Sequence, residues 1–253
     1  CTTAILIASC NKDPEFTYFF YTPEEIQVLS QYLTLPEKPD DYTVHLPKNL
    51  VDAGLRASAI DQNKAVLGRV LFYDPLLSQN RTIACASCHP QATAFSDTQA
   101  TSAGFAGERT ARNTMSIIDA RYYRDGRFFW DERAVSAEAQ ASRPIVHPVE
   151  MGMTMPVLVS KLQTISYYPQ LFQNAYGTNT IDSARIVRAL AQFVRSMVSY
   201  RTKYDTGRGA FPANQNPANV NFANFTAQEN QGKQIFFGVG RCAADRRVAV
   251  RDA

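Results

Sequence analysis

Cysteine, histidine and tryptophan are scarce in this chain of 253 residues, which has five, three and one of them respectively. No apolar run reaches the roughly 18 residues that a membrane-spanning helix needs, so the sequence predicts no transmembrane segment. The net charge is only +3 and is spread along the chain, which argues against nucleic acid as a partner. A hydrophobic content of 45% with 19% charged residues instead predicts a folded globular protein.

The first nine residues, C-T-T-A-I-L-I-A-S, are typical of the end of an export signal. The four residues from Ile7 to Cys10 are similar to a bacterial lipobox, in which small residues precede a cysteine that receives lipid. A stray cysteine in an apolar leader is the alternative, and both alternatives imply export. We therefore expect a periplasmic or otherwise exported protein with a lipid anchor at Cys10, and we assign residues 1–21 to the signal remnant and a tether.

Helical patterns dominate the remaining sequence. Capping residues and apolar spacing predict a helix that begins near Thr22, another around 66–71 that ends at Asp74, a third capped by Asp182 and a last one near Thr226. Convincing alternating strand patterns are absent. The sequence therefore predicts a mostly α fold with long loops.

A loop rich in Asn, Ala and Pro at residues 209–224 predicts a linker between two domains. Residues 22–208 would form the first domain with its flanking helices, and residues 225–253 the beginning of a second one. The boundary separates the part of the sequence that is rich in motifs from a short helical piece.

The motif C-x-x-C-H occurs once, at Cys85, Cys88 and His89. A thioredoxin-like redox pair would need a βαβ context, which the helical surroundings do not supply. A zinc site would need further ligands, but the other cysteines and histidines are scattered without ligand spacing. Covalent attachment of a c-type haem needs two cysteines one helical turn apart and an adjacent histidine on the same face. We therefore predict haem c here, with His89 as the iron ligand.

From Leu67 to about Tyr200 the chain resembles the bacterial di-haem cytochrome c peroxidase family, which includes the MauG-like enzymes. The matching stretches are L-G-R-V-L-F-Y-D-P-L-L-S (67–78), T-I-A-C-A-S-C-H (82–89), A-F-S-D (94–97), R-N-T (112–114), F-F-W-D-E-R (128–133), E-A-Q (138–140), R-P-I (143–145) and P-V-E-M-G (148–152). The resemblance implies a cytochrome c-like haem domain with long loops, followed by a stub of a second cytochrome c-like domain.

The resemblance assigns catalytic roles to Glu150 and Gln140. Glu150 matches the acid–base group of the open haem pocket, and cleavage of peroxide requires such a group to move a proton between the two oxygens. Gln140 matches a glutamine that orients peroxide or water. Without the flanking matches, each would be an ordinary surface side chain. Glu138 is expected on a solvated helix face and His147 in a loop near Glu150.

Two further positions match functional residues of the family. Trp130 matches a tryptophan between the two haems that helps electrons to cross, although a large aromatic in this setting is also expected in the core. Asn113 matches a calcium ligand at the domain interface; taken alone it is equally a helix N-cap for residues 114–119. We therefore expect a calcium ion at Asn113. A homodimer is a separate expectation.

Two departures from the family pattern carry predictions. Phe105 stands where many members have a histidine that closes the sixth iron position in the resting enzyme, and phenylalanine cannot ligate iron. Residues 232–244 resemble the approach to a second C-x-x-C-H, but Cys242 is followed by an arginine-rich end with no second cysteine and no histidine. We expect one covalent haem in this chain and a truncated or disrupted second domain.

The resemblance implies a haem peroxidase that reduces hydrogen peroxide to water with electrons from a small donor, such as a cytochrome or a cupredoxin. MauG-like oxidation of another substrate is one alternative. A mono-haem electron-transfer module is another, with Met151, Met153 or Met155 on the iron, because carriers fill the sixth position that peroxidases leave open.

Overall fold

The computed structural model describes residues 27, 41–47, 50–51, 59–123, 126–212, 214–240 and 242. Among these residues no helix is long and apolar enough to cross a membrane. The α-helices are α3 (Gln62–Tyr73), α4 (Cys85–Cys88), α5 (Ala137–Val146), α6 (Met155–Gln163), α7 (Tyr168–Tyr176), α8 (Ser183–Ser196), α9 (Lys203–Arg208) and α10 (Ala227–Phe237). Short 3-10 helices are η1 (Pro75–Leu77), η2 (Gln91–Thr93), η3 (Ala120–Tyr122) and η5 (Pro217–Asn219).

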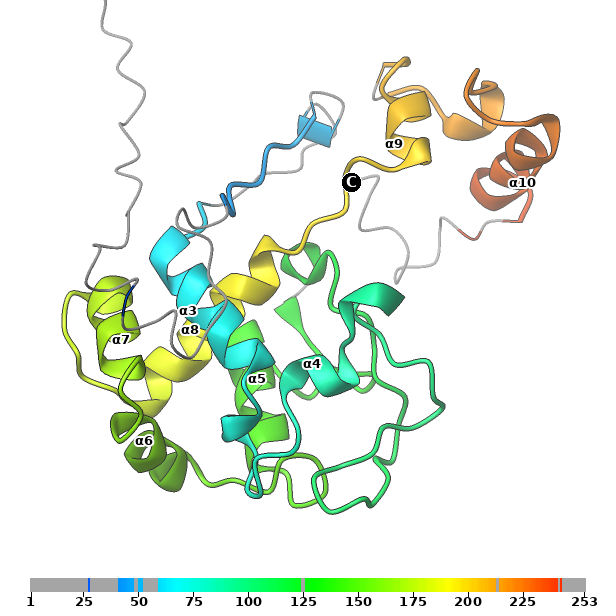
Figure 1. The fold of residues 1–253 in the computed structure, drawn as a ribbon. Coiled ribbons are helices and arrows are strands. Elements are labelled where there is room, and N and C mark those ends of the chain that lie inside the picture. Colours follow the sequence, from blue (N-terminus) through cyan, green and yellow to red (C-terminus); the bar gives the residue numbers. More distant parts are fainter. Residues whose placement is uncertain are drawn as a thin grey trace, which may run out of the picture. The chain divides into compact units, whose positions relative to one another are not determined.

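Helices α3 and α8 pack against each other and form the centre of the core (Figure 1). Asp182 caps α8 by accepting a hydrogen bond from the Arg185 amide at 2.8 Å. Gly68 allows the two helices to approach closely, because a Cβ atom there would lie only 2.0 Å from the Ala189 carbonyl oxygen. The apolar stripe of α8 therefore faces the buried side of α3.

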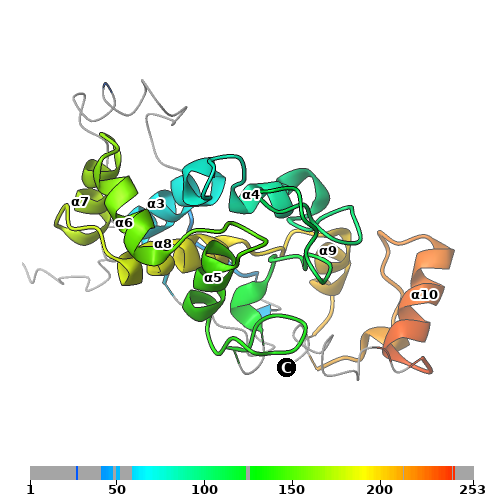
Figure 2. The same cartoon turned by 90° about the horizontal axis from the view of Figure 1, so that it is seen from below.

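The other helices of this body pack around that pair. Helix α8 lies between α3 and α5 (Figure 2), and it contacts both of them. Helix α7 packs on α3 and on α6, while the short helix α4 packs on α3. Strand pairing in the described ranges is limited to isolated bridges, between Ala103 and Arg109 and between Phe128 and Ala134. The expected mostly α fold with long loops is confirmed.

A buried carboxylate joins the end of α3 to the beginning of α7. Asp74 is 8% exposed, ends α3 and accepts a hydrogen bond from the Leu76 amide at 2.8 Å. It also accepts hydrogen bonds from the hydroxyls of Tyr167, at 2.8 Å, and Tyr168, at 2.6 Å. Burial, followed by the charge of Asp74, raises the pKa of both phenols. The two tyrosines therefore remain neutral hydrogen-bond donors to the buried charge.

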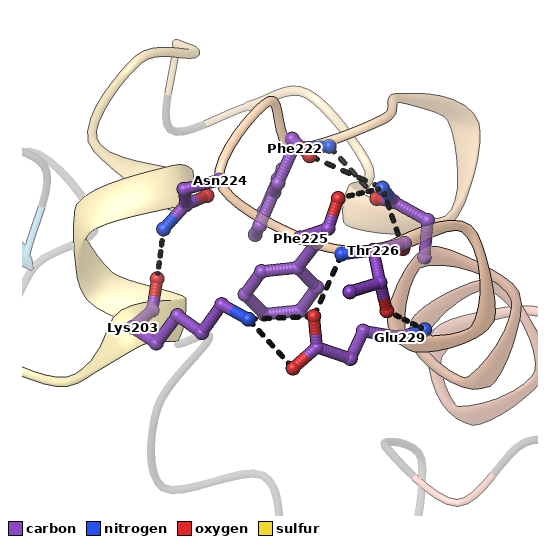
Figure 3. A network of polar contacts seen from close by, with 7 residues as sticks. Lys203, Phe222, Asn224, Phe225, Thr226 and Glu229 are labelled. Carbon is purple, nitrogen blue, oxygen red and sulfur yellow. Dashed lines mark hydrogen bonds and ion pairs between the residues drawn. The ribbon is translucent and has the colours of Figure 1, made fainter.

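Residues 203–237 contain a second packed cluster, centred on the 1%-exposed Phe222. Tyr204 of α9 and Phe225 contact its ring, with centroids 5.5 and 5.2 Å away. Figure 3 shows the polar contacts beside this cluster, in which Lys203 forms an ion pair with Glu229 of α10, and Asn224 donates to the Lys203 carbonyl at 2.7 Å. The end of the stretch predicted to be a linker, at Phe222 and Asn224, thus contacts α9 and packs beside α10.

The helices predicted at residues 66–71, 183 onward and 226 onward are confirmed as α3, α8 and α10. Thr226 caps α10 in a reciprocal pair with Glu229. The helix expected near Thr22, the lipobox and the arginine-rich end lie outside the described residues, apart from Gln27 and Cys242. The two-domain boundary stays a prediction.

Candidate functional site

A cavity lies between α4, α5, α8 and the loops around them. Its polar lining residues are Cys85, Cys88, His89, Thr110, Thr114, Gln140 and Glu150. Its apolar lining residues are Phe72, Ile83, Ala84, Ile117, Ala141, Pro144, Met151, Leu190 and Val194. The cavity is therefore an apolar chamber that brings together the C-x-x-C-H motif and two of the predicted catalytic side chains.

Helix α4 places the motif residues on one helical turn. The His89 amide donates to the Cys85 carbonyl at 3.0 Å, and the Ser87 hydroxyl accepts from the Ala84 amide at 3.0 Å. The preceding loop is held by the Ser78 hydroxyl, which accepts from the Ile83 amide at 3.1 Å. These contacts close a tight turn, which orients the three motif side chains toward one cavity.

Burial raises the pKa of the Cys85 thiol to about 12 and also raises the pKa of the Cys88 thiol. A redox-active dithiol needs the opposite shift, because the thiolate is the nucleophile. Among the described residues, moreover, no three His, Cys, Asp or Glu side chains are close enough to hold a metal ion together. The dithiol and zinc alternatives for this motif are therefore disfavoured by the structure.

His89 is held as a neutral imidazole, and one of its two ring nitrogens forms a hydrogen bond with the backbone. Its Nδ1 lies 2.9 Å from the Phe95 carbonyl oxygen, so Nδ1–H donates and Nε2 keeps its lone pair. Burial lowers the pKa of His89, against the opposing effect of the carbonyls of Phe95 and Met115. A backbone carbonyl on the far nitrogen is the usual support of a metal-ligating histidine. The site therefore presents Nε2 as a ready axial ligand.

The loop that carries Glu150 folds back on the end of α5. The Met153 amide donates to the Ile145 carbonyl at 2.9 Å, and the Glu150 carbonyl accepts from the Phe105 amide at 2.9 Å. Gly152 adopts a φ of +61°, and a Cβ atom there would lie 2.4 Å from the Phe105 ring. Glycine is therefore required at this position, and the close fit fixes the backbone beside Glu150.

Glu150 combines partial burial with nearby basic side chains. Its side chain is 28% exposed, and burial raises its pKa, while His147 and then Arg133 oppose that shift. The His147 Nδ1 lies 3.7 Å from a carboxylate oxygen and also accepts from the Val149 amide at 3.3 Å. A raised carboxyl pKa brings the group closer to neutral pH, where accepting and returning a proton are both favourable.

Trp130 and Asn113 lie outside the cavity lining. Trp130 is 53% exposed, and its indole donates to the Asn113 carbonyl at 3.0 Å, so the expectation of a core position is wrong. The Asn113 side chain is exposed and donates to the Gln99 carbonyl at 2.8 Å. Residues 114–117 are not helical, so the N-cap interpretation of Asn113 is wrong as well.

The three candidate methionines are not equivalent. Met151 is 3% exposed and lines the cavity. Met153 is also buried and Met155 is half-buried, yet neither contributes to the lining. Of the three, Met151 alone is therefore positioned to reach a group bound in the cavity.

Glu138 is not the solvated side chain that the sequence predicted. Its carboxylate receives two hydrogen bonds from Arg195 of α8, at 2.5 and 2.9 Å. The partner is 57 residues away in the sequence, so helical spacing within α5 could not reveal it. Arg133, which lowers the pKa of Glu150, ends the matching stretch 128–133, but the sequence assigned it no role. Leu190 and Val194 of α8 form part of the cavity wall, which the helical pattern of the sequence did not reveal.

A family sequence model described as di-haem cytochrome c peroxidase matches residues 62–209. The chain belongs to this family. It is 36% identical over 151 residues to a methylamine utilization protein MauG of Methylorubrum extorquens, a match covering 59% of this chain and 42% of that protein. It is 31% identical over 141 residues to a cytochrome c551 peroxidase of Nitrosomonas europaea, covering 56% and 42%. The chain thus matches less than half the length of these relatives.

Solved structures agree with the family assignment. A crystal structure of a MauG-like protein associated with microbial copper homeostasis superposes with a TM-score of 0.62 and 29% identity, covering 79% of this chain and 54% of that one. Di-haem peroxidases carry covalent haem c, and the cavity fits such a group. It offers paired cysteines, an imidazole nitrogen with a free lone pair and largely apolar walls.

Proposed function

We propose that this chain forms the peroxide-reacting haem domain of a c-type peroxidase, which reduces hydrogen peroxide to water with electrons from a small redox protein, a cytochrome or a cupredoxin. The observation that carries the proposal is the meeting of Glu150 and Gln140 with the C-x-x-C-H motif in one buried cavity. An electron carrier has no need of a partly buried acid beside its haem, whereas cleavage of peroxide does.

Cys85 and Cys88 would hold the haem through thioether bonds, and His89 would bind iron through Nε2. The bound haem supplies an iron centre that exchanges electrons with the substrate and the donor. Gln140 donates and accepts hydrogen bonds that orient peroxide in the cavity. Glu150 takes a proton from one peroxide oxygen at its carboxylate and returns it to the other, which then leaves as water.

The walls of the cavity support this chemistry by excluding bulk water. Phe72, Ile117 and Leu190 surround the polar groups with apolar surface. In such surroundings the interactions of charged and polar groups are stronger than in water. The partial exposure of Glu150, at 28%, nevertheless leaves it a route for exchanging protons with solvent.

A mono-haem electron-transfer module is the second candidate, and the position of Met151 favours it. Its buried thioether lines the same cavity and would fill the sixth iron position. The relatives named MauG support a third candidate, oxidation of a substrate other than an electron-donor protein. In that candidate the same residues react with peroxide, but the electrons then come from the oxidised substrate and not from an electron-donor protein.

A visible spectrum of the oxidised, haem-loaded chain tests the proposal against the carrier alternative. An open sixth position gives high-spin features, whereas methionine ligation gives a weak far-red band. The Met151→Leu variant provides a control, because it removes that band if Met151 is a ligand and leaves a high-spin spectrum unchanged if it is not. A far-red band in the parent chain that is lost in this variant would refute the peroxidase proposal.

The remaining expectations are part of the same proposal. We propose that the chain carries one covalent haem and binds a calcium ion at Asn113. We also propose that it is exported, receives lipid at Cys10 and forms a homodimer. The exposed Asn113 side chain is compatible with a ligand role that other residues would have to complete.

A further inference from the structure

The ring of Phe72 lies between the haem cavity and an exposed tyrosine at the end of α3. Phe72 is 2% exposed and lines the cavity, and its centroid lies 6.4 Å from that of the His89 imidazole. The ring of Tyr73 meets Phe72 edge-on, with centroids 5.2 Å apart. Tyr73 itself is 41% exposed. A single buried phenyl ring therefore links the imidazole assigned to iron with a phenol that solvent reaches.

Packing holds this arrangement in place. Phe193 of α8 contacts both rings, with centroids 5.3 Å from Phe72 and 6.3 Å from Tyr73. Edge-to-face aromatic contacts of this kind add stability beyond the area that they bury. The Tyr73 hydroxyl donates a long hydrogen bond, at 3.5 Å, to the Gln91 amide oxygen. The Tyr73 ring is thus fixed by its contacts with Phe72 and Phe193, while its hydroxyl is only weakly held.

Tyr123 provides an internal comparison. It is 40% exposed, almost the same as Tyr73. Its ring stacks on Phe128, with centroids 5.8 Å apart, and Phe128 is not a lining residue of the cavity. The two tyrosines therefore differ in their connection to the cavity and not in their access to solvent.

We propose that Tyr73 is a surface oxidation site, at which oxidising equivalents that peroxide generates in the haem cavity reach solvent through Phe72. This inference rests on the proposed peroxidase function. When no electron donor is present, the Tyr73 phenol loses one electron to the haem site and its hydroxyl proton to water, which leaves a phenoxyl radical. One peroxide takes up two electrons and two protons and becomes two water molecules. One turnover therefore draws one electron and one proton from the Tyr73 phenol of each of two chains, the second chain reducing the first radical when their surfaces meet.

The exposure of Tyr73 determines the fate of this radical. Radicals on two separate protein molecules can meet and form a carbon–carbon bond between their rings, after which the two displaced ring hydrogens move to the phenol oxygens. The product is a dityrosine cross-link between two chains. A reductant that reaches Tyr73 first returns one electron and one proton and restores the phenol, so this residue is also an entry point for electrons from small one-electron donors.

The test uses the full haem-loaded chain, hydrogen peroxide and no electron donor. The Soret absorbance reports whether peroxide reacts with the haem, while freeze-quench electron paramagnetic resonance, dityrosine fluorescence and peptide mass mapping report where the oxidising equivalents go. Tyr73→Phe keeps the ring and removes the phenol, and Tyr123→Phe is the matched control. We expect the tyrosyl signal and the covalent dimers to be lost in the first variant and retained in the second.

The outcomes separate this proposal from the proposed function. A normal Soret response with undiminished cross-linking in Tyr73→Phe would overturn the role of Tyr73 and leave the peroxidase proposal intact. Equal losses in both variants would also overturn it, because the connection to the cavity would then make no difference. A parent chain whose Soret band does not respond to peroxide would refute both proposals.

Discussion

The guanidinium of Arg195 on α8 binds the carboxylate of Glu138 on α5 through two hydrogen bonds, of 2.5 and 2.9 Å. Both side chains are about 70% buried, with exposed fractions of 28% and 30%. Burial opposes ionisation of Glu138, but the hydrogen bonds and charge of Arg195 prevail and lower its pKa. The pair therefore fastens the helix that carries Gln140 to the centre of the core.

The Glu138→Gln substitution should lower the free energy of unfolding by about 1–2 kcal/mol at neutral pH, because it breaks a bidentate, charge-assisted pair that is partly exposed. Urea unfolding of the haem-loaded chain measures this loss. Glu108→Gln is the control, since the Glu108 side chain is exposed and makes no ion pair with the described residues. Equal midpoints for the parent and Glu138→Gln would contradict the assignment.

The same pair predicts how stability depends on pH. A folded-state pKa below the unfolded value, which is about 4.3 for glutamate, means that the stabilisation is present above that value and is lost as the pH falls through the folded pKa. The difference in unfolding free energy between the parent and Glu138→Gln should therefore be full at pH 7 and shrink below about pH 4. A difference that is constant across this range would argue against a native ion pair.

The Glu150→Gln substitution should slow the reaction with peroxide by roughly 10²–10⁴-fold, or about 3–5 kcal/mol of barrier, with haem content and fold unchanged. Glutamine keeps the shape and some hydrogen bonding but cannot accept the proton. Stopped-flow measurement of the Soret change gives the rate, and Glu108→Gln is again the control. Any rate that His147 supports should disappear in the Glu150→Gln, His147→Gln double variant. An unchanged rate in fully loaded Glu150→Gln would return the electron-carrier alternative to first place.

The neighbour of Glu150 should set the pH dependence of that rate. His147 lowers the pKa of Glu150, so His147→Gln should raise it. The rate falls as Glu150 becomes protonated, and the acid limb of the profile should therefore move to higher pH in this variant. A pH profile of the peroxide reaction from pH 4 to pH 8 measures the shift. A shift to lower pH would show that His147 acts on Glu150 by another means than its charge.

The cysteine pair predicts one covalent haem in this chain. Intact-protein mass spectrometry should show a single haem addition, which Cys85→Ala or Cys88→Ala weakens and Cys242→Ala leaves unchanged. Cys242 is the matched control because it is an exposed thiol outside the cavity. Two haem additions, or a loss in the Cys242 variant, would refute the assignment of haem attachment to α4.

Phe105 predicts the resting state of the bound haem. Its ring is in the packing beside Gly152 and cannot ligate iron, so cyanide or azide should bind the oxidised protein without prior reduction. A titration followed in the Soret band measures the affinity. Low-spin bis-histidine resonances in the oxidised state would contradict this expectation and would point to His45 or His147 as a second ligand.

Local sequence signals determined the parts of the fold that could be predicted. Asp182 and Thr226 each marked the beginning of a helix because a capping side chain acts within three residues of itself. The C-x-x-C-H motif predicted the haem attachment site for the same reason, since its geometry is complete within one helical turn. Glu150 and Gln140 were found only through the resemblance to a family, and the structure brings them to the same cavity.

Long-range contacts explain what the sequence could not show. The partner of Glu138 is on another helix, and the exposure of Trp130 depends on a loop whose path no local pattern determines. The stretch at 209–224 has the composition of a linker, but Phe222 within it becomes the centre of an aromatic cluster. Composition describes the average residue of a segment, whereas one large apolar side chain can decide whether the segment is packed.

The carboxylate of Asp74 connects the cavity wall to a helix far along the sequence. Its negative charge tolerates burial because the hydroxyls of Tyr167 and Tyr168 donate to it, and both donors belong to the beginning of α7. Phe72, two residues before Asp74, therefore lies in a cavity wall that is supported by a helix beginning 94 residues beyond Asp74.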